Sequence, residues 1–174
     1  TTLQYLSTTT IEQRGTGKDF SKFPVCSGKV GLNYNHKSHY FGLFYDFRFK
    51  PSESSGPTET SRYIDGSFSE QLENSSASSR YGRQHLLSAY YTGTAGKWQL
   101  SVNLDALWQL NDRHTHEHER STVNPERDFT TANNVCNRLL AGNASASRPV
   151  WKGEMRIGTE GIHIHRTDRY AGNA

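Results

Sequence analysis

Polar and apolar residues alternate over residues 97–110, and this is the clearest pattern in the chain. Its apolar set is Trp98, Leu100, Val102, Leu104, Ala106, Trp108 and Leu110, and the intervening set is polar apart from Leu107. Because successive side chains of a strand point to opposite faces, the segment predicts a β-strand with one apolar and one polar face. It is longer than the usual strand of about 5 to 6 residues.

The length of this segment and its two tryptophans favour a strand that crosses a lipid bilayer. A transmembrane β-strand needs about 9 to 11 residues and carries aromatic side chains at both membrane interfaces. At roughly 2.7 Å of height per residue, Trp98 and Trp108 would lie about 25 Å apart along the membrane normal. The alternative is a long strand of a soluble β-sandwich that has one face on the core.

Further segments predict strands at 1–13, 25–35, 39–50, 84–92, 138–148 and 154–165. The strongest of these, 39–50, places Phe41, Leu43, Tyr45, Phe47 and Phe49 on one face and Asp46, Arg48 and Lys50 on the other. Gly42 falls on the polar face, where a barrel often needs a small residue. Together these segments predict an all-β fold built as an antiparallel up-and-down meander.

The predicted connections alternate in length along the chain. After a loop at 14–24, they are short at 36–38, 92–96 and 149–153, and long and polar at 51–83 and 112–137. Every second connection of a meander falls on the same rim, and bacterial outer-membrane barrels have short turns on one rim and long loops on the other. We therefore predict that residues 1–174 are a single segment, a partial transmembrane β-barrel of about 6–8 strands.

The composition agrees with a fold that has little protein core. Fewer than one residue in five is Leu, Ile, Val or Phe, and the net charge is only +3. Charged disorder needs a larger net charge, whereas a membrane barrel needs apolar side chains on only one face of each strand. The Lys and Arg residues are scattered, so no nucleic-acid partner is expected. No apolar run approaches the length of a transmembrane helix, and no signal peptide is found.

Few residues suggest chemistry. His114, His116 and His118 alternate, so in an extended chain they share a face on which zinc, copper or nickel could bind; the competing reading is a solvated polar stretch. Cys26 and Cys136 are too far apart for a zinc knuckle or a redox pair, which leaves a disulfide or two free thiols. We assign no catalytic residue, no cofactor and no metal site, and expect no enzyme.

Several segments resemble TonB-dependent receptors, an outer-membrane β-barrel family. They are residues 31–37, residues 86–91 leading into 96–98, residues 137–142 leading into 148–153, and residues 158–160 with 166–170. The resemblance covers nearly the whole chain in consistent order, through strand-and-turn patterns and not catalytic signatures. The chain differs from the family in having no plug domain, no energy-coupling box and no terminal strand that ends in an aromatic residue.

The resemblance implies a segment of a larger barrel in the cell outer membrane, which takes up a ligand across that membrane. The implied partners are outer-membrane lipid, the remainder of the barrel with its plug, a periplasmic energy-coupling protein and an extracellular ligand of unknown identity. On this reading the lipid-facing residues include Phe41, Leu43, Tyr45, Phe47, Phe49, Trp98, Leu100, Val102, Leu104 and Trp108. The lumen-facing residues include Lys29, Asn33, Asp46, Arg48, Gln99, Asn103 and Asp105. The long loops would hold the ligand contacts.

Two other functions fit the sequence. One is a soluble, secreted β-sandwich or barrel that binds sugar or protein through its loops, and it predicts a chain that folds without detergent. The other is a metal-binding module that uses the histidine run, and it predicts a zinc-dependent melting temperature that is lost on His116→Ala.

Overall fold

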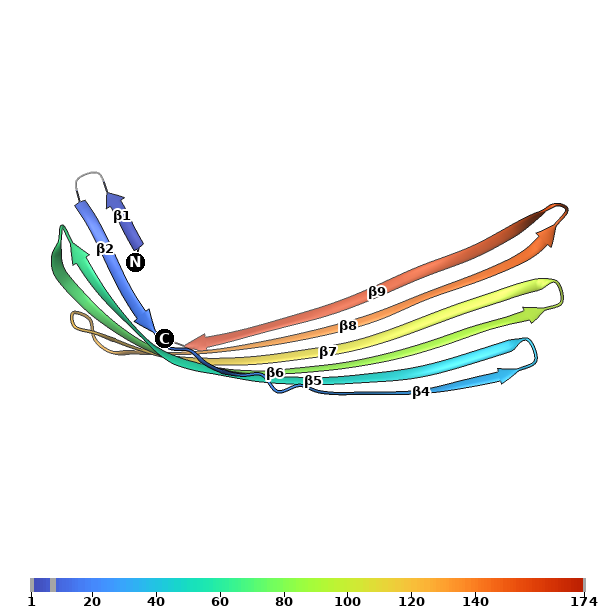
Figure 1. Ribbon diagram of the computed structural model, residues 1–174, viewed down its shortest axis with the longest axis horizontal. Coiled ribbons are helices and arrows are strands. Elements are labelled where there is room, and N and C mark those ends of the chain that lie inside the picture. The colour runs from blue at the N-terminus through green and yellow to red at the C-terminus, as the bar shows by residue number, and fades with distance from the viewer. Residues whose placement is uncertain (1, 7–8, 174) are drawn as a thin grey trace.

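The computed structural model describes residues 2–6 and 9–173, which form one antiparallel β-sheet (Figure 1). The strands are β1 (Thr2–Leu6), β2 (Thr9–Gly17), β3 (Phe20–Lys22), β4 (Cys26–His36), β5 (His39–Ile64), β6 (Ser67–Ala95), β7 (Trp98–Ser121), β8 (Arg127–Val150) and β9 (Gly153–Asn173). Among these residues there is no helix that is long and apolar enough to span a membrane. The all-β meander predicted from the sequence is confirmed, and the sheet curls as an open half-barrel.

The strands lie in the order β1-β2-β5-β6-β7-β8-β9, and β3 and β4 also pair with β5. β2, β3 and β4 follow one another along the same edge of β5 without any change of register, from Ile11 opposite Ile64 to His36 opposite His39. They therefore act as one long strand with two interruptions, at residues 18–19 and 23–25. The predictions of a single strand at 1–13 and a loop at 14–24 were wrong, because this segment folds back once and then pairs with the distal half of β5.

The two segments predicted as long polar loops, 51–83 and 112–137, are instead mostly strands. β5 and β6 continue to a two-residue turn at Asp65 and Gly66, whose φ angles of 49° and 80° suit the hairpin turn that an Asp-Gly pair favours. β7 and β8 continue to a short connection at residues 122–126. Backbone pairing extends along these hairpins although neither face is apolar, so the period-two signal on which the sequence prediction depended is absent there.

The short turns predicted on the other rim are confirmed, at residues 37–38, 96–97 and 151–152. The first residue of each turn has a positive φ: 54° at Lys37, 61° at Gly96 and 55° at Trp151. A left-handed first position matches the right-handed twist of the flanking strands, and glycine adopts it without strain. These three tight turns fix the register of the hairpins that they join.

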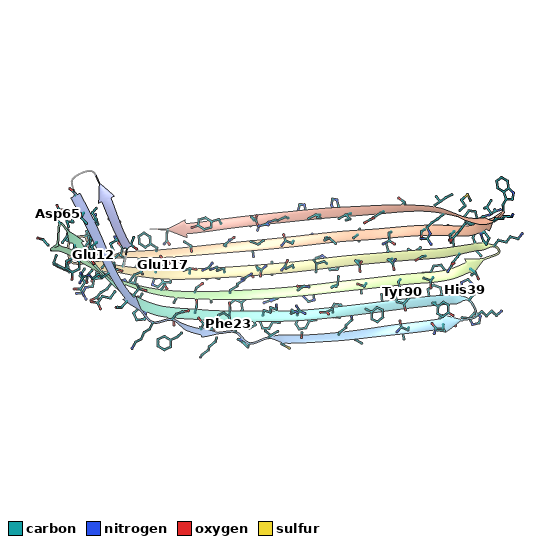
Figure 2. All side chains as sticks on the ribbon, turned by 45° about the horizontal axis from the view of Figure 1, so that its top comes forward. Glu12, Phe23, His39, Asp65, Tyr90 and Glu117 are labelled. Carbon is teal, nitrogen blue, oxygen red and sulfur yellow. The ribbon has the colours of Figure 1, made fainter. Side chains whose placement is uncertain are left out.

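Among residues 2–6 and 9–173, nothing forms a second layer over either face of this sheet. Within the described residues no apolar side chain is buried, and more than twenty large apolar side chains are exposed. Figure 2 shows side chains projecting from both faces along the full length of the strands. The packing that exists therefore lies within each face, between neighbouring strands.

One such packing contact confirms the small-residue role predicted for Gly42. This glycine is buried on the polar face, where the ring of Tyr90 lies across it. The Tyr90 hydroxyl donates to Asn33 Oδ1 at 3.0 Å, and its ring stacks on Phe44 with 6.0 Å between centroids. Tyr90 thus links three strands across a gap that only glycine leaves open.

We expect Gly42→Ala to lower the free energy of unfolding by about 1–3 kcal/mol, because the added methyl group would overlap the Tyr90 ring. Gly28→Ala is the matched control, since a Cβ at that residue meets nothing within 4 Å. It should leave stability within about 0.5 kcal/mol. Urea titration followed by tryptophan fluorescence measures both changes, and equal losses in the two variants would contradict the packing described.

Candidate functional site

The register sorts the predicted lipid-facing and lumen-facing residues onto opposite faces of the sheet. In one cross-strand row, for example, Leu32, Leu43, Ala89 and Leu104 lie side by side. We call this face of β4–β9 the apolar belt; its main members are Val30, Leu32, Tyr34, Phe41, Leu43, Tyr45, Phe47, Phe49, Leu87, Ala89, Tyr91, Trp98, Leu100, Val102, Leu104, Ala106, Trp108, Leu110, Leu140, Ala144 and Ile157. Every residue predicted to face lipid lies on it, and every residue predicted to face a lumen lies on the opposite, polar face.

Aromatic groups gather at both ends of the apolar belt. Toward the short-turn rim, the rings of Phe41 and Tyr91 are 4.8 Å apart, and His39 Nδ1 lies 2.9 Å from the Tyr91 hydroxyl. Toward the other end, the rings of Phe47 and His85 are 5.4 Å apart, and Trp108 lies directly opposite His85. Aromatic side chains with a polar group suit a boundary between apolar and aqueous surroundings. The middle of the belt is aliphatic and about half exposed, with Leu104 at 52%.

The apolar belt is weakest at β8 and β9. Arg138 lies opposite Trp108 on one side and His165 on the other, and His163 lies opposite Leu140. These polar residues share the belt's face and stand near the level of Trp108, toward the distal end of the belt. His163 and His165 also lie away from the histidine run, because its first member, His114, pairs with Ala132 three rows beyond Arg138.

The histidine run lies beyond the apolar belt, on the same face. Same-face neighbours of a strand are about 7 Å apart, so the three histidine side chains start from a row along β7. His118 Nδ1 lies 3.0 Å and His116 Nε2 lies 3.6 Å from the same oxygen of Asp128. In the part of the chain that the structure describes, no three His, Cys, Asp or Glu side chains are arranged to hold a metal ion. Cys26 and Cys136 carry free thiols.

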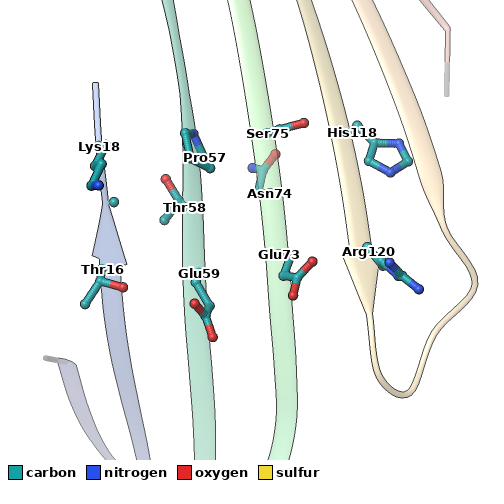
Figure 3. Close-up of a pocket in the computed structure, with 11 residues that line it drawn as sticks. Thr16, Lys18, Pro57, Thr58, Glu59, Glu73, Asn74, Ser75, His118 and Arg120 are labelled. Carbon is teal, nitrogen blue, oxygen red and sulfur yellow. The ribbon is translucent and has the colours of Figure 1, made fainter. Parts of the chain in front are cut away.

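An open hollow of about 600 Å³ lies near the ends of the long hairpins (Figure 3). Glu59 stands directly opposite Glu73, and Glu73 stands opposite Arg120. Arg120 is also paired with Glu126 at 3.2 Å, and Lys18 closes the other side. The sequence did not single out these residues, because only the register of β5, β6 and β7 brings them together.

The polar face carries hydrogen bonds between strands and one group of positive charges. Ser88 donates to Asp105 at 2.5 Å, and the Asn103 amide donates to Asn143 at 2.9 Å. Further along β5, β6 and β7 lie Arg48, Lys50, Arg80 and Arg113, which we call the cationic cluster. The sequence pattern placed Arg48 and Lys50 on this face. It missed the cluster, because Arg80 and Arg113 lie far apart in the chain.

The hairpin ends are tied together by Glu70. Its carboxylate accepts a hydrogen bond from the Ser121 hydroxyl at 2.6 Å and one from the Asn124 amide at 3.1 Å, and Arg62 lies 3.7 Å away. The Ser121 hydroxyl, followed by Asn124 and Arg62, holds the pKa of Glu70 below its ordinary value of 4.5. Glu70 therefore connects β5, β6, β7 and the connection at residues 122–126 while it is ionised.

We expect these ends to loosen in acid. A carboxyl whose pKa is lowered by folding contributes stability above its unfolded pKa of 4.5, and this is lost as pH falls through the lower folded value. Hydrogen–deuterium exchange of residues 122–126, corrected for intrinsic rates, should rise below about pH 4. In Glu70→Gln the exchange should already be fast at pH 7 and change little with pH. An unchanged pH profile in that variant would contradict this role.

Comparisons with known proteins give only distant similarities. No protein-family model and no curated protein matches the sequence. Among solved structures, the unliganded ferric citrate transporter FecA is 10% identical with a TM-score of 0.32, over 94% of this chain and 32% of that chain. The copper transporter OprC is 9% identical with a TM-score of 0.21, over 93% and 38%. The ferric preacinetobactin receptor BauA from Acinetobacter baumannii is 8% identical with a TM-score of 0.20, over 94% and 37%.

The chain thus spans about a third of the length of FecA, of which it matches 32%. These weakly similar structures are outer-membrane transporters and receptors, and all of the quoted TM-scores are below 0.5.

Proposed function

We propose that this chain is part of the wall of an outer-membrane β-barrel that takes up a ligand, with the apolar belt against lipid and the polar face lining the lumen. The observation that carries the proposal is the apolar belt itself, which crosses six neighbouring strands on a sheet that has no covering layer. Trp98 and Trp108 lie on one strand near the two limits of the belt.

The size of the apolar belt supports a lipid contact. Six strands at about 4.8 Å spacing and a height of about 25 Å give a projected area of roughly 600–700 Å². On a typical soluble monomer, the largest apolar patch has about 300–600 Å² of accessible surface. The projected area of such a patch is smaller than its accessible surface, so the apolar belt is larger than a typical patch. Water would therefore contact an unusually large apolar surface, whereas a bilayer of matching thickness would cover it.

The strands extend far past the belt, and this supports a role for the distal half in ligand contact. β6 has 29 residues, whereas a membrane crossing needs about 9 to 11. The remainder projects on one side as paired hairpins with polar side chains on both faces. In the proposed barrel these hairpins take the place of the loops that the sequence predicted.

The outer edges of β4 and β9 pair with no described strand. Unpaired backbone groups are very unfavourable in lipid, so the proposed barrel is closed by further strands. A plug and an energy-coupling partner follow only from the sequence resemblance and stay predictions.

The first test compares the chain in buffer with the chain in detergent. We expect aggregation in buffer, and β-structure by circular dichroism with a single size-exclusion peak in detergent or together with the remainder of the barrel. Monodisperse, cooperatively folding β-structure without detergent would contradict the proposal and favour the soluble sugar- or protein-binding β-sandwich or barrel.

A pair of neighbouring substitutions tests which face meets lipid. Leu104→Arg would place a charge in the middle of the apolar belt and should cost about 2–4 kcal/mol of unfolding free energy in lipid vesicles. Asn103→Arg, one residue away on the polar face, should cost less than about 1 kcal/mol. Urea unfolding in vesicles measures both, and a larger loss for Asn103→Arg would show that the faces are assigned the wrong way round.

A further inference from the structure

The cationic cluster occupies three successive rows of the polar face. Arg48 lies opposite Gln84, and Lys50 lies opposite Gly82. In the next row Arg80 lies directly opposite Arg113 on the neighbouring strand. Rows on one face are about 7 Å apart and neighbouring strands about 4.8 Å apart, so the backbone positions of the four residues cover roughly 14 Å by 10 Å.

These charges form no ion pair with any residue that the structure describes. The ion pairs found among the described residues involve Arg14, Arg62, His116, His118, Arg120, Arg156 and Arg166, and none of them includes a member of the cationic cluster. Like charges directly opposite each other destabilise a strand pair, so the Arg80–Arg113 pair is unfavourable as it stands. An anion between the two guanidinium groups would remove this repulsion.

Neutral neighbours hold the two arginines and supply further polar groups. Arg80 Nη2 donates to Asn111 Oδ1 at 3.2 Å, and Arg113 Nε donates to Ser78 Oγ at 3.2 Å. Each of these guanidinium groups keeps other N–H donors for a ligand. The amides of Gln84 and Gln109 lie in the same region, beside a hollow of about 330 Å³.

The hollow is bounded by the interruption between β3 and β4. Residues 23–25 leave the edge of β5 there and, with Arg48, Lys50 and Arg80, line the hollow. Gly82 lies in the middle row between Lys50 and Asn111, and Asn111 Oδ1 lies 3.2 Å from where a Cβ of Gly82 would stand. Arg48, Lys50 and Arg80 therefore border an open space on the polar face, and Arg113 stands directly beside Arg80.

We propose that the cationic cluster binds a small multivalent oxyanion, one that carries two or more carboxylate or phosphate groups. A single phosphate is too small to contact all three rows, whereas a ligand with several oxyanion groups can contact Arg48, Lys50 and the arginine pair together. Guanidinium groups bind carboxylate and phosphate oxygens in pairs, which makes arginine well suited to this ligand class. The inference extends the proposed function, since it names the ligand class for the proposed lumen.

Isothermal titration calorimetry with two probes tests the inference: tripolyphosphate, and butane-1,2,3,4-tetracarboxylate. We expect both probes to bind more tightly than inorganic phosphate, and we expect their affinity to fall as the NaCl concentration rises. The probe that binds more tightly shows whether the cluster prefers phosphate or carboxylate groups. The double variant Arg80→Gln with Arg113→Gln should lose at least about tenfold in affinity. Arg138→Gln is the matched control, because Arg138 is equally a surface arginine but lies on the belt's face.

Three results would overturn the inference: no binding of either probe at millimolar concentration, an unchanged affinity in the double variant, or an equal loss in Arg138→Gln. If the double variant does not fold by circular dichroism, the pair Arg48→Gln with Lys50→Gln replaces it, with the same expectation. A chain that folds in buffer without detergent would contradict the proposed barrel but can be titrated in the same way. Failure of the barrel and failure of the anion site are therefore distinguishable.

Discussion

An apolar face with no protein layer over it is the constraint on which the rest of this structure depends. Most folded domains bury such a face against helices or a second sheet, and here no apolar side chain of the described residues is buried. A single curved sheet is sufficient only when its surroundings cover that face. In the proposed barrel, lipid covers it at the height that Trp98 and Trp108 define, and such a barrel needs few aliphatic residues.

The tight turns at one rim determine which residues are neighbours along the whole length of the strands. A two-residue turn sets the register of its hairpin, and that register then continues without a slip along β6 and β7, from Ala95 opposite Trp98 to Leu72 opposite Ser121. A slip of one residue would exchange the two faces of a strand. The register that places Leu104 on the belt therefore also places Arg80 beside Arg113, past the end of the belt and on the other face.

The sequence was informative where one face of a strand is apolar and uninformative where neither is. Alternation predicted the strand cores at 97–110 and 39–50 and the faces of their residues. The same criterion failed over 51–83 and 112–137, because strands with polar side chains on both faces show no alternation of apolar and polar residues. The Asp65-Gly66 pair was a usable hairpin signal inside the first of these segments. The cationic cluster could not have been predicted, since Arg80 and Arg113 meet only through the register of β6 and β7.

The most direct test of the central claim is the accessibility of single spin labels at residues 99–108 of the chain in lipid vesicles, measured with oxygen and with a water-soluble nickel complex. If the belt faces lipid, oxygen accessibility peaks at even positions such as 102 and 104, and nickel accessibility peaks at odd positions such as 103 and 105. The account predicts this period-two alternation with opposite phases for the two reagents. Equal accessibility of both faces to nickel, or the opposite phase, would contradict it.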